Sequence, residues 1–432
     1  MLRQELKALI NDGKRVTAND AVREQHSKAL SYYAPSLPDV VVYPKTRKEV
    51  CQIVNYANTH QIPLVPFGAG SSLEGQIIPV DGGISLDFSM MNRILSIEPN
   101  NFLAVVEPGV TRNQLNRELK KHGLFFPIDP GADATIGGMT ATNASGTNAV
   151  RYGVMRDYVL GLEVVQANGH VMRTGGKALK SSAGYGLTNL FVGSEGTLGV
   201  FTEITVKLVG IPETDVVAKA VFTSIEGAGQ TALVQAEDGI RDCTIELVDE
   251  ETIAAINDYK NTDYPVAPTL FLEFSGSRAV VEESVVIAKE LVEGSDCLSF
   301  QFETDSVEKA KLWEARHHAA FAIIARYKNK GIMSADVCVP VAYLPEALVE
   351  TRRIVEQHQL DAAIFGHVGD GNYHAALPVD ASDPEDIQRV EAVNKQIIEY
   401  ALSKGGTCTG EHGIGLGKKQ YLVQEHASAI PM

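Results

Sequence analysis

The stretch Phe365-Gly-His-Val-Gly-Asp-Gly-Asn-Tyr-His-Ala375 has two apolar arms around a turn of glycine, aspartate and asparagine. Glycine and asparagine tolerate positive φ, so the pattern predicts a β-hairpin centred between Asp370 and Gly371. In that hairpin His367 and His374 are directly paired on neighbouring strands, with Cβ atoms about 5 Å apart. Two imidazoles at this separation can bind one metal ion, or they can be two half-buried histidines beside a turn.

A second stretch, Thr407-Cys-Thr-Gly-Glu-His-Gly-Ile-Gly-Leu-Gly417, places Glu411 and His412 side by side among glycines. Glycine removes side-chain bulk and lets the backbone approach another group closely. A carboxylate from this stretch would complete a His/His/Glu set with open positions, as in a catalytic metal site. In an extended segment neighbouring side chains point to opposite faces, so one of the pair would serve the metal and the other would move a proton. The alternative is a glycine loop whose charged pair is solvated.

The composition is that of an ordinary globular protein. A chain of 432 residues predicts two or three domains, and its 38 basic and 54 acidic residues give a formal charge of −16. This balance argues against a general nucleic-acid surface or anionic-membrane surface, because both need clustered lysine and arginine. It leaves room for a local basic pocket that binds an anionic substrate.

The cysteines and the N-terminus indicate a reducing compartment. Five cysteines are scattered through the chain without a C-x-x-C pair (Cys51, Cys243, Cys297, Cys338 and Cys408), so no disulfide framework or iron–sulfur motif is expected. The start of the chain lacks a signal-peptide core, and no apolar run approaches the roughly 20 residues of a membrane helix. We expect a cytoplasmic protein, or one that is peripheral at the inner face of the membrane.

Glycine-rich stretches mark the first half of the chain. The loop 68–75 follows an expected strand at 40–42, a helix capped by Thr46 and a strand at 62–65. Its backbone N–H groups could bind a pyrophosphate, although it is neither a G-x-G-x-x-G motif nor a Walker loop, and a plain turn is the alternative. The small residues of 129–146 suit a backbone wall against a flat ligand, or else a long loop.

From residue 216 onward the second half of the chain is predicted to alternate strands and helices, after a change of sequence pattern around 210–215 that marks the expected domain boundary. This rhythm predicts an open α+β sheet with helices on one face. A helix over roughly 305–328 carries Arg316 on its apolar stripe, where an unpaired cation is costly. Its guanidinium could bind a substrate carboxylate, or pair with an internal aspartate or glutamate.

Taken together, these stretches resemble the flavin-dependent D-2-hydroxy-acid dehydrogenases of the vanillyl-alcohol oxidase fold superfamily, nearest to cytochrome-linked D-lactate dehydrogenases and glycolate oxidase catalytic subunits. The resemblance covers nearly the whole chain. The motifs that carry it are Pro66-Phe-Gly-Ala-Gly-Ser-Ser72, 129–146, Gly193-Ser-Glu-Gly-Thr-Leu-Gly199, Asp336-Val-Cys-Val-Pro340, Gly366–His374 and Cys408–Gly415.

The resemblance implies an α+β fold in three parts. A two-part FAD-binding domain would cover 1–212, and an α+β substrate and metal-binding cap domain with an antiparallel sheet would cover 213–405. A C-terminal segment, 406–432, would carry Glu411 and His412 back toward the flavin.

The resemblance also implies a set of FAD-binding residues. They would wrap the pyrophosphate, line the ribityl chain and isoalloxazine, and hold the adenine side: Pro66, Gly68, Ala69, Gly70, Ser71, Ser72, Pro130, Asp133, Ile136, Gly137, Gly138, Thr140, Asn143, Gly146, Glu195, Gly196, Gly199, Val200 and Ile204. Some relatives attach the flavin through a histidine in the pyrophosphate loop. No histidine lies between His60 and His122, so we expect non-covalent FAD.

For the second half the resemblance implies a divalent metal, zinc by expectation, on His367, His374 and Glu411. His412 would be the general base and Arg316 the clamp for the substrate carboxylate. The substrate would also contact Asn372 and the two metal-binding histidines. In the implied reaction His412 takes the α-hydroxyl proton while the flavin accepts the Cα hydride, which leaves a 2-keto acid.

Two departures from the family pattern bear on these expectations. Ser334-Ala-Asp336 stands where relatives that act on dicarboxylates have a lysine before Tyr-Asp, which favours a small monocarboxylate such as D-lactate. The chain ends at Met432 without the Asn-Pro-Gly-Lys segment of relatives, so we expect a shortened sequence and a looser flavin site.

The expected partners are a small D-2-hydroxy acid and an external electron acceptor, namely a cytochrome, a quinone or an electron-transfer flavoprotein. We expect no nucleic acid and at most peripheral membrane contact. Two hypotheses from other functional classes remain. The first is a zinc hydrolase, since a His/His/Glu site with a bound water fits a hydrolase equally well, and the second is a non-catalytic flavin- or metal-binding module.

Overall fold

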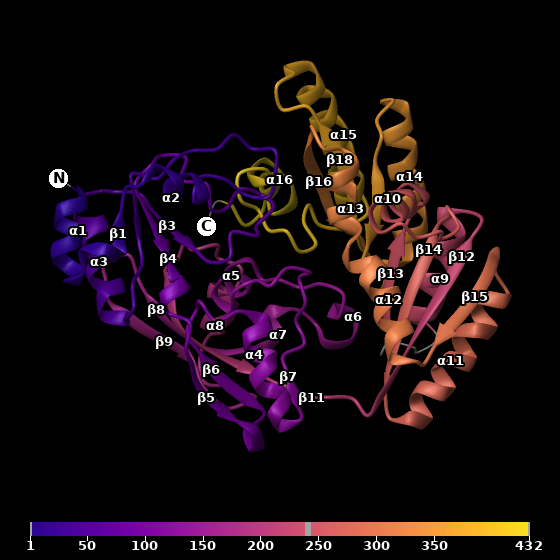
Figure 1. The fold of residues 1–432 in the computed structure, drawn as a ribbon, viewed down its shortest axis with the longest axis horizontal. Coiled ribbons are helices and arrows are strands. Elements are labelled where there is room, and N and C mark those ends of the chain that lie inside the picture. Colours follow the sequence, from indigo (N-terminus) through magenta and orange to yellow (C-terminus); the bar gives the residue numbers. More distant parts are fainter. Residues whose placement is uncertain (1, 238–242, 431–432) are drawn as a thin grey trace. The chain divides into compact units, whose positions relative to one another are not determined.

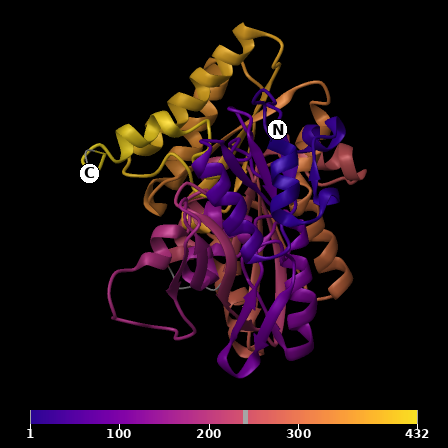
Figure 2. The ribbon, with the colours of Figure 1, turned by 90° about the vertical axis from the view of Figure 1, so that its left-hand side faces the viewer.

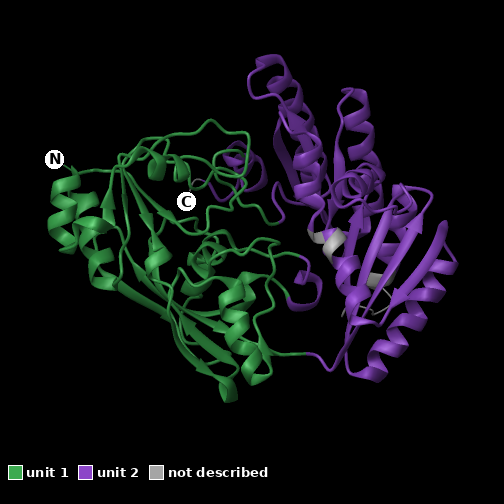
Figure 3. Ribbon diagram, in the orientation of Figure 1, with its two compact units in different colours: residues 1–146, 153–211, 411–417 green, residues 147–152, 212–410, 418–432 purple. Residues whose placement is uncertain are grey.

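The computed structural model describes residues 2–237 and 243–430 of the chain, which divide into two compact units (Figure 3). Unit 1 comprises residues 1–146, 153–211 and 411–417, and unit 2 comprises 147–152, 212–410 and 418–432. The chain leaves unit 1 after Ile211, next to the predicted boundary at 212. Within the predicted C-terminal segment 406–432, residues 411–417 belong to unit 1 and the other residues belong to unit 2.

Unit 1 contains a four-stranded sheet and a five-stranded sheet (Figures 1 and 2 show the ribbon in perpendicular views). The first has the order β1 (Val16–Thr17), β2 (Val40–Val42), β4 (Ile84–Asp87) and β3 (Leu64–Phe67), with β2 and β3 both parallel to β4. The second is antiparallel, in the order β5 (Ile94–Glu98), β6 (Leu103–Val106), β10 (Val200–Lys207), β8 (Val159–Val165) and β9 (Val171–Gly175). Strands β7 (Leu124–Phe125) and β11 (Val209–Gly210) form a small antiparallel pair.

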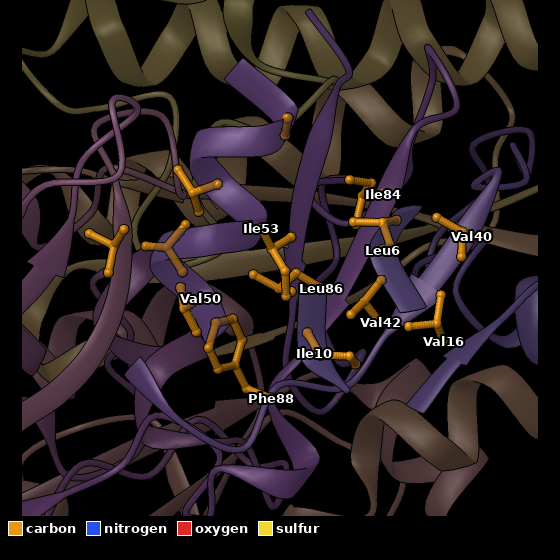
Figure 4. Close-up of a cluster of buried hydrophobic side chains, with 14 of the residues drawn as sticks. Leu6, Ile10, Val16, Val40, Val42, Val50, Ile53, Ile84, Leu86 and Phe88 are labelled. Carbon is orange, nitrogen blue, oxygen red and sulfur yellow. The ribbon is translucent and has the colours of Figure 1, made fainter. Parts of the chain in front are cut away.

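The helices of unit 1 are α1 (Leu2–Ile10), α2 (Asp20–Gln25), α3 (Arg47–Thr59), α4 (Arg112–Leu119), α5 (Ile136–Thr142), α7 (Met155–Tyr158) and α8 (Leu187–Phe191). Figure 4 shows the core in which α1 and α3 pack on the first sheet through Leu6, Ile53 and Leu86. The predicted cap of α3 is confirmed, because the Thr46 side chain accepts a hydrogen bond from the Glu49 N–H. The stretch 129–146 is neither a continuous backbone surface nor one long loop, because it contains helix α5, which is capped by Thr135.

Unit 2 is built on a seven-stranded antiparallel sheet. Its order is β15 (Cys297–Glu303), β12 (Thr214–Phe222), β14 (Thr269–Gly276), β13 (Cys243–Val248), β17 (Ala363–Gly366), β18 (Asn372–Val379) and β16 (Gly331–Cys338). The helices are α6 (Ala149–Tyr152), α9 (Ile225–Glu237), α10 (Glu250–Lys260), α11 (Arg278–Glu293), α12 (Ser306–His317), α13 (Ala319–Arg326), α14 (Leu344–Gln357), α15 (Pro384–Ser403) and α16 (Lys419–Glu425).

The prediction of helices on only one face of this sheet was wrong. Val217 of β12 belongs to a core shared with α10, α12 and α13, and the next residue, Ala218, is also fully buried. Successive strand residues point to opposite faces, so both faces of β12 are covered. The predicted single helix over 305–328 is also two helices, α12 and α13, with a break at His318.

None of the helices within residues 2–237 and 243–430 combines the length and the apolarity needed to cross a membrane.

Candidate active site

Unit 1 contains a cavity of about 360 Å³ whose wall is made largely of backbone and small side chains. Most of the predicted FAD residues line it: Pro66, Gly68, Ala69, Gly70, Ser71, Ser72, Pro130, Gly137, Gly138, Glu195, Gly196, Gly199 and Val200. The glycine loop after β3 therefore reaches the small-residue stretch around α5, as the resemblance implied. At Gly68 a Cβ would lie 2.3 Å from the Thr135 Oγ1 atom, so only glycine allows this approach.

The other predicted FAD residues do not line this cavity, and their contacts explain why. Ile136 and Ile204 are fully buried, and the buried Thr140 hydroxyl donates to the Ile136 carbonyl. Asp133 is exposed and accepts a hydrogen bond from the Asn113 N–H. The last two, Asn143 and Gly146, shape the backbone: Asn143 has a positive φ, and a Cβ on Gly146 would lie 1.6 Å from the Asp129 carbonyl oxygen.

Glu411 and His412 both line the unit 1 cavity, and the opposite faces expected of an extended segment do not have to apply here. The His412 Nε2 atom lies 3.9 Å from Glu411 Oε1, and the Ser145 hydroxyl donates to Glu411 Oε2 at 2.9 Å. The segment does not extend as a strand, because Gly413 and Gly415 both have positive φ. Neighbouring side chains can therefore share one face.

The segment 411–417 is fixed to unit 1 by two residues that the sequence did not single out for this task. Gln76 Nε2 donates to the His412 carbonyl at 2.7 Å. The Glu195 carboxylate accepts from the N–H groups of Ile414 at 2.7 Å and Gly415 at 2.9 Å. Glu195, which the resemblance assigned to the adenine side, thus also anchors the C-terminal segment. Gln76 follows the glycine loop directly, but a lone glutamine gives no sequence signal.

Unit 2 brings together two of the predicted metal ligands. The rings of His367 and His374 have centroids 5.5 Å apart, and both side chains are buried. They are not directly paired, however, because His374 of β18 lies opposite Phe365 of β17. A 3₁₀ turn at Val368–Asp370 places His367 beyond the end of β17, which corrects the predicted hairpin register.

Each imidazole is next to a buried carboxylate. His367 Nδ1 lies 2.7 Å from Glu246 Oε1, and His374 Nδ1 lies 3.3 Å from Asp336 Oδ1. Both acidic side chains have no exposed surface. Their partners lie far away in sequence, so spacing could not reveal them. An acidic residue inside an apolar strand, as in Ile245-Glu-Leu247, was the available signal.

Arg316 contacts an internal carboxylate, which was one of its two predicted partners. Its Nη2 and Nε atoms lie 2.6 Å and 2.8 Å from Glu246 Oε2. Burial acts to raise the pKa of Glu246, but the charges of His367 and Arg316 outweigh it and hold that pKa below its ordinary value. Glu246 is therefore an anion shared by a guanidinium and an imidazole.

Asn372, expected to contact the substrate, has a different role in the structure. Its side-chain amide donates to Asp336 Oδ1 and to the Val337 carbonyl, both at 2.8 Å. Asp336 Oδ2 accepts from the Thr409 hydroxyl at 2.8 Å, and the buried Lys418 ammonium donates to the Asp336 carbonyl at 2.8 Å. Asn372 therefore supports the carboxylate beside His374, and its N–H groups are already used.

Comparison with known proteins agrees with this architecture. Residues 211–429 match the family of FAD linked oxidases, C-terminal domain, and residues 38–175 match an FAD binding domain. A probable mitochondrial D-lactate dehydrogenase of Danio rerio is 43% identical over 95% of this chain and 83% of its own length. A cytochrome-type mitochondrial D-lactate dehydrogenase of Arabidopsis thaliana is 40% identical over 98% of this chain and 74% of its own.

Glycolate oxidase subunit GlcD of Bacillus subtilis is 38% identical over 95% of this chain and 86% of its own length. Among solved structures, p-cresol methylhydroxylase has a TM-score of 0.80 at 19% identity, covering 98% of this chain and 90% of that one, which supports the predicted fold. These findings do not support the hypothesis of a zinc hydrolase. The chain belongs to the FAD-linked oxidase family and is an FAD-dependent oxidoreductase.

Proposed function

We propose that this flavoprotein oxidises D-lactate, or a similarly small D-2-hydroxy acid, to the 2-keto acid. The observation that carries the proposal is a histidine, His412, that lines the unit 1 cavity, the proposed FAD site, beside the Glu411 carboxylate. The relatives named D-lactate dehydrogenase, at 43% and 40% identity over nearly the whole chain, support the choice of substrate.

His412 is the proposed general base. Imidazole accepts protons near neutral pH, so it suits removal of the proton from a substrate hydroxyl. The hydrogen bond from Gln76 to the His412 carbonyl holds the backbone of a residue that lines the cavity. FAD, when bound, supplies the acceptor for the two electrons released at the substrate carbon.

We also propose that His367, His374 and Glu411 hold a divalent metal ion, with zinc as the expected ion. The donor set fits, because a ring nitrogen of each histidine lies next to a buried carboxylate, as is usual for metal-ligating histidines. Glu411 would add the carboxylate that completes a His/His/Glu set with open positions. Such an ion would hold the α-hydroxyl and lower its pKa.

Arg316 is the proposed clamp for the substrate carboxylate, because a guanidinium binds a carboxylate through two parallel hydrogen bonds. The sequence Ser334-Ala-Asp336, without a second cation there, supports a monocarboxylate. Glycolate is the alternative, favoured by the 38% identity to a glycolate oxidase subunit. The electrons would then pass to a cytochrome, a quinone or an electron-transfer flavoprotein, and a charge of −16 supports at most peripheral contact with an anionic membrane.

The test is steady-state oxidation of a substrate panel by the FAD-loaded protein with a dye as electron acceptor. The panel contains D-lactate, L-lactate, glycolate and D-2-hydroxyglutarate, each measured before and after a chelator and again after added zinc. We expect the highest kcat/KM for D-lactate, loss of activity with chelator and recovery with zinc. A highest kcat/KM for glycolate would favour the alternative, and no oxidation of any 2-hydroxy acid would refute the proposal.

A further inference from the structure

We propose that Glu246 is a positioning residue that holds the Arg316 guanidinium and the His367 imidazole in fixed orientations through one shared carboxylate. This inference rests on the proposed function, in which Arg316 binds the substrate carboxylate and His367 binds the metal. It adds a residue to the site and couples two tasks, substrate binding and metal binding, that the proposed function treats as separate.

The two oxygens of Glu246 serve different partners. Oε2 lies 2.6 Å from Arg316 Nη2 and 2.8 Å from Arg316 Nε, and Oε1 lies 2.7 Å from His367 Nδ1. Glu246 lies on β13 and its side chain has no exposed surface. A buried carboxylate is strongly unfavourable unless charged and hydrogen-bonding partners compensate it, so the three side chains form one interdependent cluster.

For Arg316, this contact fixes which part of the guanidinium can bind a ligand. Glu246 uses the edge formed by Nε and Nη2, so the edge formed by Nη1 and Nη2 keeps N–H groups for a second carboxylate. The Phe365 ring supports the same group, because the Arg316 Cζ atom lies 5.5 Å from the ring centroid. Glu246 and Phe365 together restrict the guanidinium to one plane.

For His367, the contact fixes the tautomer. An ionised carboxylate only accepts hydrogen bonds, so His367 Nδ1 must carry the proton that it donates to Glu246. In the neutral ring the lone pair is then on Nε2, the nitrogen that would bind the proposed metal ion. His374 Nδ1 lies 3.3 Å from a different carboxylate, Asp336 Oδ1. A change at Glu246 should therefore leave the contact between His374 and Asp336 in place.

The decisive variant is Glu246→Gln, which keeps the size of the side chain. An amide has one accepting oxygen and one donating nitrogen, so it cannot accept from Arg316 and His367 through both ends. The matched control is Glu251→Gln, because Glu251 likewise joins an arginine and a second side chain in unit 2: Arg326 at 2.7 Å and the Tyr327 hydroxyl at 2.9 Å.

We expect Glu246→Gln to keep its FAD while zinc affinity, measured by competition with a chelator, falls about 10–100-fold. We also expect KM for D-lactate to rise at least about tenfold. Glu251→Gln should change neither quantity. Zinc affinity and KM in Glu246→Gln that equal the wild-type values would overturn the proposal.

A second measurement is made on the wild-type protein, and a variant serves only for assignment. In metal-free wild-type protein with ¹⁵N-labelled histidine, the long-range ¹H–¹⁵N NMR spectrum reports which ring nitrogen of His367 carries the proton, with His367→Asn used for assignment. The Nδ1–H tautomer supports the proposal, and the Nε2–H tautomer overturns it. If no D-2-hydroxy acid is oxidised by wild-type protein, the proposed function fails, while the tautomer still decides the positioning role.

Discussion

The cavity of unit 1, which is the proposed FAD site, and the histidine cluster of unit 2 are built from different kinds of residues. Many residues of the cavity wall are glycine, alanine or serine, and the wall includes close approaches such as that of Gly68 to Thr135. The histidine cluster depends on buried charges, since the Glu246 and Asp336 side chains have no exposed surface and Lys418 has 1%. A wall of backbone should be sensitive to added bulk, whereas a cluster of buried charges should be sensitive to neutralisation of one member.

His412 is the proposed general base in the wall of the unit 1 cavity, so its replacement should have the largest effect. We expect His412→Ala to slow anaerobic reduction of FAD by D-lactate about 10²–10⁴-fold, since general-base catalysis contributes about that much. The FAD content of the variant should equal that of the wild type. Gln76 binds the His412 backbone carbonyl and not the ring, so this contact with the cavity segment is kept. Stopped-flow absorbance measures the rate, with the exposed His122→Ala as control. An unchanged rate of FAD reduction in His412→Ala would show that His412 is not the general base.

Neutralising a buried charge in unit 2 should strongly lower stability. Lys418→Met removes the ammonium that donates to the Asp336 carbonyl at 2.8 Å and lies 3.7 Å from its carboxylate. Breaking a buried pair in this way costs roughly 3–5 kcal/mol in the free energy of unfolding. Denaturant unfolding measures the cost, and Lys419→Met, at an exposed neighbouring position, is the control. Equal stability of the two variants would show that unit 2 does not depend on this charge.

Adding one methyl group at Gly146, which follows the cavity-lining Ser145, should have a moderate effect. A Cβ at Gly146 would lie 1.6 Å from the Asp129 carbonyl oxygen, and Gly146 has φ of +127°. We expect Gly146→Ala to lose about 1–3 kcal/mol of stability through strain, and to bind FAD more weakly. Thermal unfolding and the ratio of flavin to protein absorbance measure both. Gly176→Ala is the control, because nothing lies within 4 Å of a Cβ there, and a loss of FAD in both variants would count against the contact at Gly146.

The smallest effect is expected for a buried ion pair of unit 1 that has no part in the cavity. Glu49 binds Arg15 at 2.8 Å. Burial acts to raise the pKa of Glu49, but the hydrogen bonds from Arg15 outweigh it and lower that pKa below its ordinary 4.5. The stabilisation is therefore complete above pH 4.5 and is lost as the pH falls through the folded-state pKa.

The pH dependence of thermal unfolding tests this pair. The difference in Tm between wild type and Glu49→Gln should shrink as the pH is lowered from 7 toward 4, while the rate of FAD reduction at pH 7 should stay the same in both. A Tm difference that grows toward low pH would contradict the assigned shift.

The contrast between the two sites also explains what could be predicted from the sequence. The wall of unit 1 depends on local features, so the glycine loop at 68–72 and the Thr46 cap were found from neighbouring residues. The histidine cluster depends on contacts between distant residues: Glu246 lies 121 positions from His367, and spacing gives no sign of it. The register of the hairpin was missed because a 3₁₀ turn, which a glycine-rich turn also permits, follows β17.

The proposed function requires that a D-2-hydroxy acid reduces the bound FAD. The most direct measurement mixes FAD-loaded protein with D-lactate, or with L-lactate, in the absence of oxygen and follows the visible flavin absorbance and the keto acid formed. We expect D-lactate to bleach the flavin with one pyruvate formed per FAD, and L-lactate to do so far more slowly. A flavin that D-lactate leaves oxidised, or that both enantiomers reduce at the same rate, would contradict it.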